Sequence, residues 1–115
     1  MSRPIAVLGG TGPEGFGLAL RWAQAGETVI IGSRDLKRAQ EAASKIQDKL
    51  GSNAEVSAKE NIEACAEADL LVLTIPFEAH ATLLKQLKPA IRSGTIVVEA
   101  LSYIRGRSIA HQFMI

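Results

Sequence analysis

The sequence predicts an α/β fold, a Rossmann-type doubly wound parallel sheet of strand order 3-2-1-4-5. Three observations predict it. Short apolar runs alternate with helical patterns along the chain, and a glycine-rich turn follows the first of these runs. The run at residues 70–75, LLVLTI, is apolar on both faces, as expected of a central parallel strand covered by helices on each side. Right-handed crossovers between parallel strands then give the order.

The first predicted unit is a strand, a tight turn, a helix and a second strand. An apolar run at Ile5–Leu8 ends in glycines at positions 10, 12 and 15, and a second apolar run follows at Val29–Ile31. The glycines fit the GxGxxG dinucleotide fingerprint. Gly10 permits the turn, Gly12 lets the backbone approach a pyrophosphate, and Gly15 lets helix and strand pack closely. We therefore expect a dinucleotide site here, since a purely structural turn would leave the third glycine unexplained.

The helix after this turn is expected to begin at Pro13, because the missing N–H of proline is not needed at the first helical position. The unpaired amide groups and the positive end of the helix dipole make an anion site without a basic side chain. Glu14 would contribute its backbone N–H, with its carboxylate pointing away from the phosphates. The apolar residues of this helix share one face: Leu18, Ala19, Trp22 and Ala23.

A second helix is predicted over Leu36–Leu50, where apolar residues recur at three- and four-residue spacing and indicate an amphipathic helix lying on the sheet. Asp35 is the expected N-cap and Gly51 the expected stop. A short, weak strand at Glu55–Ser57 should then lead to a helix at about Asn61–Ala68. The apolar positions of the second helix are Leu36, Ala39, Ala43, Ile46 and Leu50.

The second half of the sheet should begin with the buried run Leu70–Ile75. A helix is expected over about 78–87, and a fifth strand at Thr95–Val98. The sequence after Glu99 has no clear period, so no element is predicted there and the fifth strand is expected to form an exposed edge. Length predicts a single domain over residues 1–115, and the nucleotide signals argued here and below make it a single NADP-binding domain.

The end of the second strand distinguishes NADP from NAD. Chains that prefer NAD usually place Asp or Glu there, about 20 residues beyond the glycine turn, to bind the ribose 2′-hydroxyl. Here the residues are Gly32, Ser33 and Arg34. A hydroxyl and a guanidinium can donate to a 2′-phosphate, and Arg38 follows one helical turn later. We predict NADP, with Ser33, Arg34 and Arg38 at the 2′-phosphate. The alternative is that the arginines form a solvated helix surface.

The end of the fourth strand is the other predicted contact with the ligand. In open parallel sheets, ligands lie beyond the carboxyl ends of the strands at the switch in strand order, here between the first and fourth strands. Thr74, Ile75 and Pro76 should border the nicotinamide ribose, with Phe77 beside them or in the core. His80 is expected to be a surface or hydrogen-bonded histidine rather than a catalytic one.

Composition and charge argue against several classes of function. The chain has 115 residues, 47% hydrophobic and 22% charged, with a net charge of +1, so it has no electrostatic footprint for nucleic acid or an anionic membrane. No apolar run approaches the roughly 20 residues that span a bilayer, and the N-terminus does not resemble a secretory signal. The single cysteine, Cys65, fits a buried small residue in a reducing compartment. We expect a cytoplasmic protein without a metal site.

Three stretches of the chain resemble a known family. GGTGPEGFGLALRWAQAGETVIIGSRD, ADLLVLTIPFEAH and GTIVVEA are similar to the N-terminal domain of the NADPH-dependent reductases of coenzyme F-420, an 8-hydroxy-5-deazaflavin. The resemblance covers nearly the whole chain up to about residue 100. It implies that hydride moves directly between NADPH and the deazaflavin, with no side chain as acid, base or nucleophile. No catalytic residue is therefore predicted.

The same resemblance implies positions for the cofactor. Thr11 to Glu14, with Gly15, would contact the pyrophosphate, and Ile75 would lie near the nicotinamide. His80 departs from the family pattern, because it stands one residue later than the family's histidine. With the residues of the fingerprint, the predicted cofactor-binding set is Gly10, Thr11, Gly12, Pro13, Glu14, Gly15, Ser33, Arg34, Arg38, Thr74, Ile75 and Pro76.

Length separates this chain from the family that it resembles. Family members are about twice as long, and their second half closes the deazaflavin site and helps to form a homodimer. We therefore expect a C-terminally truncated form of the fold, whether a fragment, a truncated product or a free-standing binding domain. Two alternatives remain open. One is an NADP-dependent reductase of a small metabolite, similar to pyrroline-carboxylate reductases or 6-phosphogluconate dehydrogenases, and the other is a non-enzymatic NADPH-sensing module.

Overall fold

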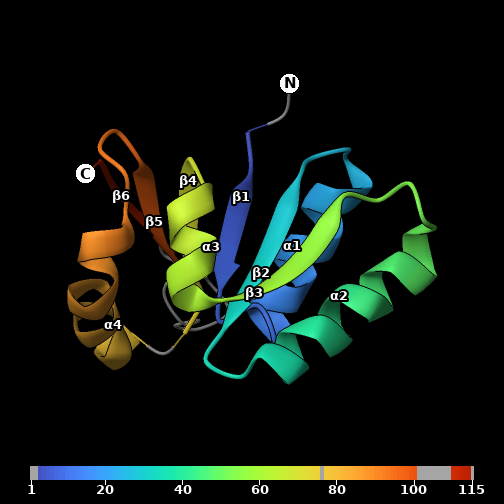
Figure 1. Cartoon of the computed structure of the whole chain (residues 1–115), viewed down its shortest axis with the longest axis horizontal. Helices are drawn as coiled ribbons and strands as arrows, with labels where there is room; N and C mark the ends of the chain where they lie inside the picture. Colours follow the sequence, from blue (N-terminus) through green and yellow to red (C-terminus); the bar gives the residue numbers. More distant parts are fainter. Residues whose placement is uncertain (1–2, 76, 101–109, 115) are drawn as a thin grey trace.

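Six strands form one sheet in the computed structural model, in the order β3-β2-β1-β4-β5-β6. The structure describes residues 3–75, 77–100 and 110–114. The first five strands run parallel and keep the predicted order 3-2-1-4-5, so the expected Rossmann-type topology is confirmed (Figure 1). The strands are β1 (Ile5–Leu8), β2 (Val29–Ser33), β3 (Val56–Glu60), β4 (Leu70–Leu73), β5 (Ile96–Ala100) and β6 (Ala110–Met114).

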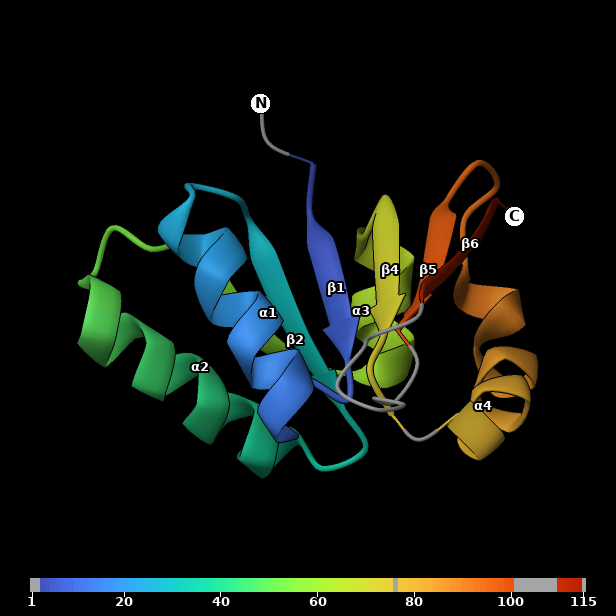
Figure 2. The same ribbon diagram turned by 180° about the vertical axis from the view of Figure 1, so that it is seen from behind.

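Helices cover both faces of this sheet. α1 and α2 lie on one face, as Figure 2 shows, and α3 and α4 lie on the other (Figure 1). None of the described helices is long and apolar enough to cross a membrane. The helices are α1 (Pro13–Gln24), α2 (Leu36–Leu50), α3 (Asn61–Glu67) and α4 (His80–Leu87), with single 3₁₀ turns at η1 (Phe77–Ala79) and η2 (Lys88–Ala90).

Each face of the sheet has its own core, because neighbouring strand residues point to opposite sides. In β1, Val7 packs in the cluster that includes α1 and α2, whereas Ala6 and Leu8 pack in the cluster of α3 and α4. Cys65 of α3 is fully buried in the second cluster, as predicted, and burial raises the pKa of its thiol to about 11. The double-sided burial makes β1 the centre of the fold.

The termini of α2 agree with the prediction. The Asp35 side chain accepts a hydrogen bond of 3.1 Å from the backbone N–H of Lys37, and Gly51 ends the helix at φ +93°. The predicted apolar face is wrong at Leu36, which is 38% exposed, while Ala42 is buried instead. Leu36 is the first residue of α2, which begins only two residues after the end of β2, so it lies at the carboxyl edge of the sheet.

The structure differs from the sequence prediction most at the ends of the strands. β3 covers Val56–Glu60 rather than 55–57, β4 ends at Leu73 rather than Ile75, and β5 begins at Ile96. The expectation that β5 is an exposed edge is wrong, because β6 pairs with it antiparallel, from Ile96 with Met114 to Ala100 with Ala110. β6 reads AHQFM, which has no regular alternation of apolar and polar residues, so its strand character comes from the partner.

We expect the replacement Leu73→Ala to lower the free energy of unfolding by about 2–5 kcal/mol, because Leu73 is fully buried in β4 and the cavity would not be filled. Ile62→Ala is the control, since Ile62 is 59% exposed on α3 and its loss should cost about 0.5 kcal/mol or less. Urea unfolding followed by circular dichroism measures both. Equal losses would contradict the placement of β4 in the core.

Candidate functional site

The turn from β1 to α1 contains two adjacent glycines with different roles. Gly9 has φ +81°, a left-handed conformation that side chains rarely adopt, and a Cβ added there would lie 2.5 Å from Ile75 Cγ2. A Cβ on Gly10 would lie 2.9 Å from Ile31 Cγ2 and 3.0 Å from the carbonyl oxygen of Val7. The backbone freedom that the sequence analysis assigned to Gly10 is therefore needed at Gly9, whereas Gly10 is small because the core leaves it no room.

Backbone hydrogen bonds hold this turn between the ends of β2 and β4. The N–H of Gly9 donates to the carbonyl of Gly32 at 3.0 Å, on the β2 side. On the β4 side, Thr74 donates twice to the carbonyl of Leu8, from its N–H at 3.0 Å and from its hydroxyl at 2.8 Å. The hydroxyl of Thr74 thus donates its hydrogen within the protein. Thr74, predicted to contact the ligand, positions the turn in this structure.

Gly12 and Gly15 differ in the space that a side chain would have. A Cβ on Gly15 would lie 2.5 Å from Thr74 Oγ1 and 2.8 Å from the carbonyl oxygen of Gly9, so α1 packs directly on the turn and on the end of β4. A Cβ on Gly12 would have only the carbonyl oxygen of Gly9 near it, at 3.6 Å. The backbone at Gly12 is therefore open on the side where a bound phosphate could approach it.

The first turn of α1 presents backbone N–H groups at the same place. Pro13 is the first helical residue, and the N-cap Gly12 has no side chain that could accept a hydrogen bond. The first N–H to find a helical acceptor is that of Phe16, which donates to Gly12 at 2.8 Å. The N–H groups of Glu14 and Gly15 have no acceptor in the described part of the chain. With the helix dipole they form a site for an anion.

The end of β2 and the residues that follow it carry hydrogen-bond donors that have no partner among the described residues. Ser33 is 8% exposed, and its Oγ accepts from the N–H of Asp35 at 3.1 Å, which leaves the hydroxyl hydrogen available to another group. Arg34 and Arg38 are exposed, and neither has an ion pair within residues 3–75, 77–100 and 110–114. The nearby carboxylate of Asp35 accepts from the N–H of Lys37, so it caps α2. Basic groups therefore dominate the surface after β2.

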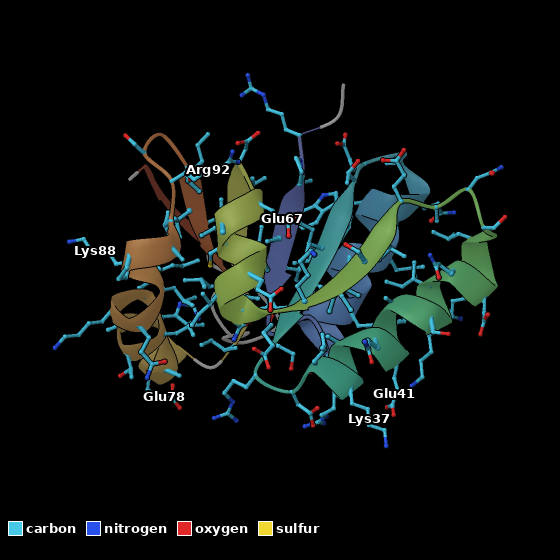
Figure 3. All side chains as sticks on the ribbon, viewed as in Figure 1. Lys37, Glu41, Glu67, Glu78, Lys88 and Arg92 are labelled. Atoms are coloured by element: carbon cyan, nitrogen blue, oxygen red, sulfur yellow. The ribbon has the colours of Figure 1, made fainter. Side chains whose placement is uncertain are left out.

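A hollow of about 330 Å³ lies between the start of α1, which is predicted to bind the pyrophosphate, and α2, which carries Arg38 of the predicted 2′-phosphate site. It brings Arg38 of α2 beside the residues at the start of α1, and Lys45 shares it although the sequence analysis did not select Lys45. The seven-residue spacing of Arg38 and Lys45 places both on one helix face and could have indicated this. Glu41 contributes a carboxylate to the same hollow, and Figure 3 shows it with Lys37 near the start of α2. The lining residues are Thr11, Gly12, Pro13, Phe16, Arg38, Glu41, Ala42 and Lys45.

The end of β4 is only partly described. Ile75 is half-buried and packs against Gly9, so it lies beside the glycine turn, and its predicted contact with the nicotinamide end stays a prediction. Pro76 lies outside the described residues. His80 is 2% exposed, with Nε2 at 2.7 Å from the carbonyl oxygen of Ile75 and Nδ1 at 3.1 Å from Glu99 Oε2. The sequence allowed a surface histidine or a hydrogen-bonded one, and His80 is therefore the second. The sequence analysis missed its partner, Glu99.

A larger hollow of about 710 Å³ lies at the opposite, amino edge of the sheet, between Trp22, Asp69 and Ile96. Figure 3 shows Arg92, whose guanidinium pairs with Asp69, at that edge. Ligands of open parallel sheets bind at the carboxyl edge, so size does not decide between the two hollows. The carboxyl edge carries the glycine turn and the unpaired donors. Within the described residues, no group of three His, Cys, Asp or Glu side chains could hold a metal ion.

Comparison with known proteins identifies the family of the chain. Residues 4–103 match the model of a family described as "NADP oxidoreductase coenzyme F420-dependent". The chain is 45% identical over 98 residues to the F420-dependent NADP reductase of Methanothermobacter thermautotrophicus, and 45% identical over 97 residues to that of Methanocaldococcus jannaschii. The matches cover 84% and 82% of this chain but only 42% and 43% of those proteins. The chain thus spans less than half the length of these relatives.

Solved structures show the same fold. The minor L-lactate dehydrogenase of Enterococcus mundtii superposes with a TM-score of 0.72 at 20% sequence identity, over 88% of this chain and 38% of that protein. At this identity the comparison supports the arrangement of strands and helices alone. It agrees with the strand order described above.

We expect alanine at Gly15 and alanine at Gly12 to affect stability differently. Alanine favours a helix interior by about 1 kcal/mol over glycine, yet Gly15→Ala should lower the free energy of unfolding by about 1–3 kcal/mol because its Cβ meets Thr74 and backbone atoms. Gly12→Ala has the space that it needs and should cost about 1 kcal/mol or less. Thermal and urea unfolding of the two variants test this. A stabilised Gly15→Ala would show that the turn is looser than described.

Proposed function

The chain belongs to the family of coenzyme F420-dependent NADP oxidoreductases, and from this premise we propose that it binds NADP(H) at the carboxyl edge of its sheet. The proposed role is to hold the nicotinamide cofactor of a hydride-transfer reaction. The observation that carries the proposal is the glycine turn, where an open backbone at Gly12 meets the unpaired N–H groups of α1. This combination suits a pyrophosphate and needs no basic side chain.

The preference for NADP rests on the donors after β2. Ser33 has a hydroxyl hydrogen to donate, and Arg34 and Arg38 have guanidinium groups without ion-pair partners in the described ranges. A guanidinium suits a phosphate because it can donate two parallel hydrogen bonds. These three donors outnumber the two nearby carboxylates, Asp35, which caps α2, and Glu41. These residues support a 2′-phosphate pocket at the start of α2.

In the proposed site, the residues of this chain bind and orient rather than react. NADPH supplies a hydride from its nicotinamide ring when bound. Thr74 and Ile75 keep the glycine turn in place beside β4, where the nicotinamide end of the cofactor is proposed to lie. No general acid or base is needed for a direct hydride transfer, and we propose none. Catalysis would then depend on holding the two rings in a near-attack geometry.

We further propose that the partner in hydride transfer is the deazaflavin coenzyme F-420. The support is that two relatives at 45% identity are named F420-dependent NADP reductases. Those proteins are more than twice as long as the matched segment, and we propose that the part of them without a counterpart in this chain contributes to the deazaflavin site. A homodimer of the longer form is part of the same proposal. The 115 residues would then supply the nucleotide half of the site.

We expect the chain to bind NADPH roughly 10- to 150-fold more tightly than NADH, because one charge-assisted hydrogen bond to the 2′-phosphate contributes about 1.5–3 kcal/mol. Arg34→Ala should remove most of this preference and leave the affinity for NADH nearly unchanged. Isothermal titration calorimetry with both cofactors measures it.

Two variants control this experiment. Arg21→Ala removes an exposed arginine from the last turn of α1, away from the site, and should change neither affinity. Gly12→Val should abolish the binding of both cofactors while the helical circular dichroism persists, because its side chain would occupy the place of the pyrophosphate. Equal affinity of the unmodified chain for NADPH and NADH would refute the 2′-phosphate pocket.

We expect the 115-residue chain, mixed with NADPH and oxidised deazaflavin, to show no hydride transfer above a no-protein control. Positioning of two reactants can contribute roughly 7–11 kcal/mol to lowering a barrier, and a nucleotide half alone would not hold both rings. The loss of the visible absorbance of the deazaflavin measures the reaction. Turnover of about one per second or faster, within the usual range for enzymes, would show that these residues form a complete site.

A further inference from the structure

The contact between His80 and Glu99 is the most buried pairing of a nitrogen base with a carboxylate among the described residues. The two side chains are 3% and 16% exposed, and Nδ1 lies 3.1 Å from Oε2. The other pairs within the described ranges, Lys59 with Glu67 and Arg92 with Asp69, join side chains that are at least 30% exposed. Exposed pairs contribute little to stability. Removing one partner of a buried pair, in contrast, leaves the other partner desolvated and unpaired. The position of His80 is therefore strongly constrained.

The other ring nitrogen of His80 reaches back across the connection from β4 to α4. Nε2 lies 2.7 Å from the carbonyl oxygen of Ile75, five residues earlier. A carbonyl oxygen only accepts, so Nε2 carries a hydrogen in this arrangement. On the other side of the ring, Glu99 Oε2 lies within hydrogen-bond distance of Nδ1, at 3.1 Å. The ring thus connects β5, through Glu99, to the main chain that leaves β4.

Ile75 is also the residue that contacts the glycine turn. A Cβ built on Gly9 would lie 2.5 Å from Ile75 Cγ2 and 3.3 Å from the Ile75 backbone nitrogen. The preceding residue, Thr74, is bonded to Leu8 through both its N–H and its hydroxyl. Ile75 is therefore held from two sides, with its side chain on the turn and its carbonyl on His80. This segment lies where the strand order reverses, between the parallel strands β1 and β4.

We infer that His80, held by Glu99, is a positioning residue that fixes the Ile75 main chain beside the nicotinamide half of the bound cofactor. The inference rests on the proposed function. The effect of His80 on cofactor binding should be confined to one half of the cofactor. The 2′-phosphate half is proposed to lie at Ser33, Arg34 and α2, on the other side of the glycine turn. Loss of the His80 hydrogen bond should therefore weaken contacts to the nicotinamide half and leave the adenosine half unchanged.

The test compares NADPH with adenosine 2′,5′-bisphosphate, a probe that has the 2′-phosphate but no nicotinamide. His80→Leu should weaken NADPH binding about tenfold, because the Ile75 main chain would then have to be ordered when the cofactor binds, and reduce the enhancement of nicotinamide fluorescence on binding. The affinity for the bisphosphate should change less than about twofold. His80→Gln should restore both NADPH readouts, because its amide N–H can still donate to the Ile75 carbonyl. Lys85→Ala, an exposed position on α4, is the matched control and should change none of them.

The outcomes separate this inference from the proposed function. If the unmodified chain binds neither probe, the proposed function fails and the inference fails with it. If it binds both, and His80→Leu weakens both equally or neither, only the inference is overturned. Should His80→Leu not fold, as circular dichroism would show, Glu99→Leu decides. It keeps the histidine but removes the group that orients it, and a selective loss of NADPH binding supports the inference, whereas no loss or an equal loss overturns it.

Discussion

The lack of space for side chains where β1 turns into α1 is the constraint on which the rest of the site depends. Gly9, Gly10 and Gly15 would each bring a Cβ within 3 Å of a neighbouring atom, so the turn, the helix and the end of β4 lie in direct contact. Interiors are close-packed and tolerate little added volume. This contact places the first turn of α1 at the carboxyl edge of the sheet, where the N–H groups of Glu14 and Gly15 have no acceptor among the described residues.

The electrostatics of the edge follow from this placement. An anion is attracted by the unpaired N–H groups of Glu14 and Gly15 and by the helix dipole, both of which are fixed before any ligand arrives. The basic residues of α2 add to the field, and the opposing carboxylate of Asp35 is directed to the backbone N–H of Lys37, where it caps the helix. Backbone groups thus provide the general affinity for phosphate that we propose, and side chains provide the choice of nucleotide.

Much of the fold could be predicted because its signals are local. The apolar run of β1, the bounds of α2 and the cap at Asp35 each depend on residues within a few positions, and all agree with the structure. β6 could not be predicted, since its five residues become a strand only by pairing with β5. The exposure of Leu36 was missed for a related reason. Helical periodicity gives the face of a residue, but not whether the sheet extends beneath it.

The sequence by itself determined the order of the elements, the glycine turn and the carboxylate-free end of β2, because each is a matter of residue type and spacing along the chain. Only the tertiary structure decided that Gly9 carries the strained backbone, that Thr74 bonds to Leu8, and that His80 links Glu99 to Ile75. Thr74 and Leu8 are 66 positions apart, and His80 and Glu99 are 19 apart. Such contacts arise when crossover connections bring separate strands side by side, and no local pattern in the sequence records them.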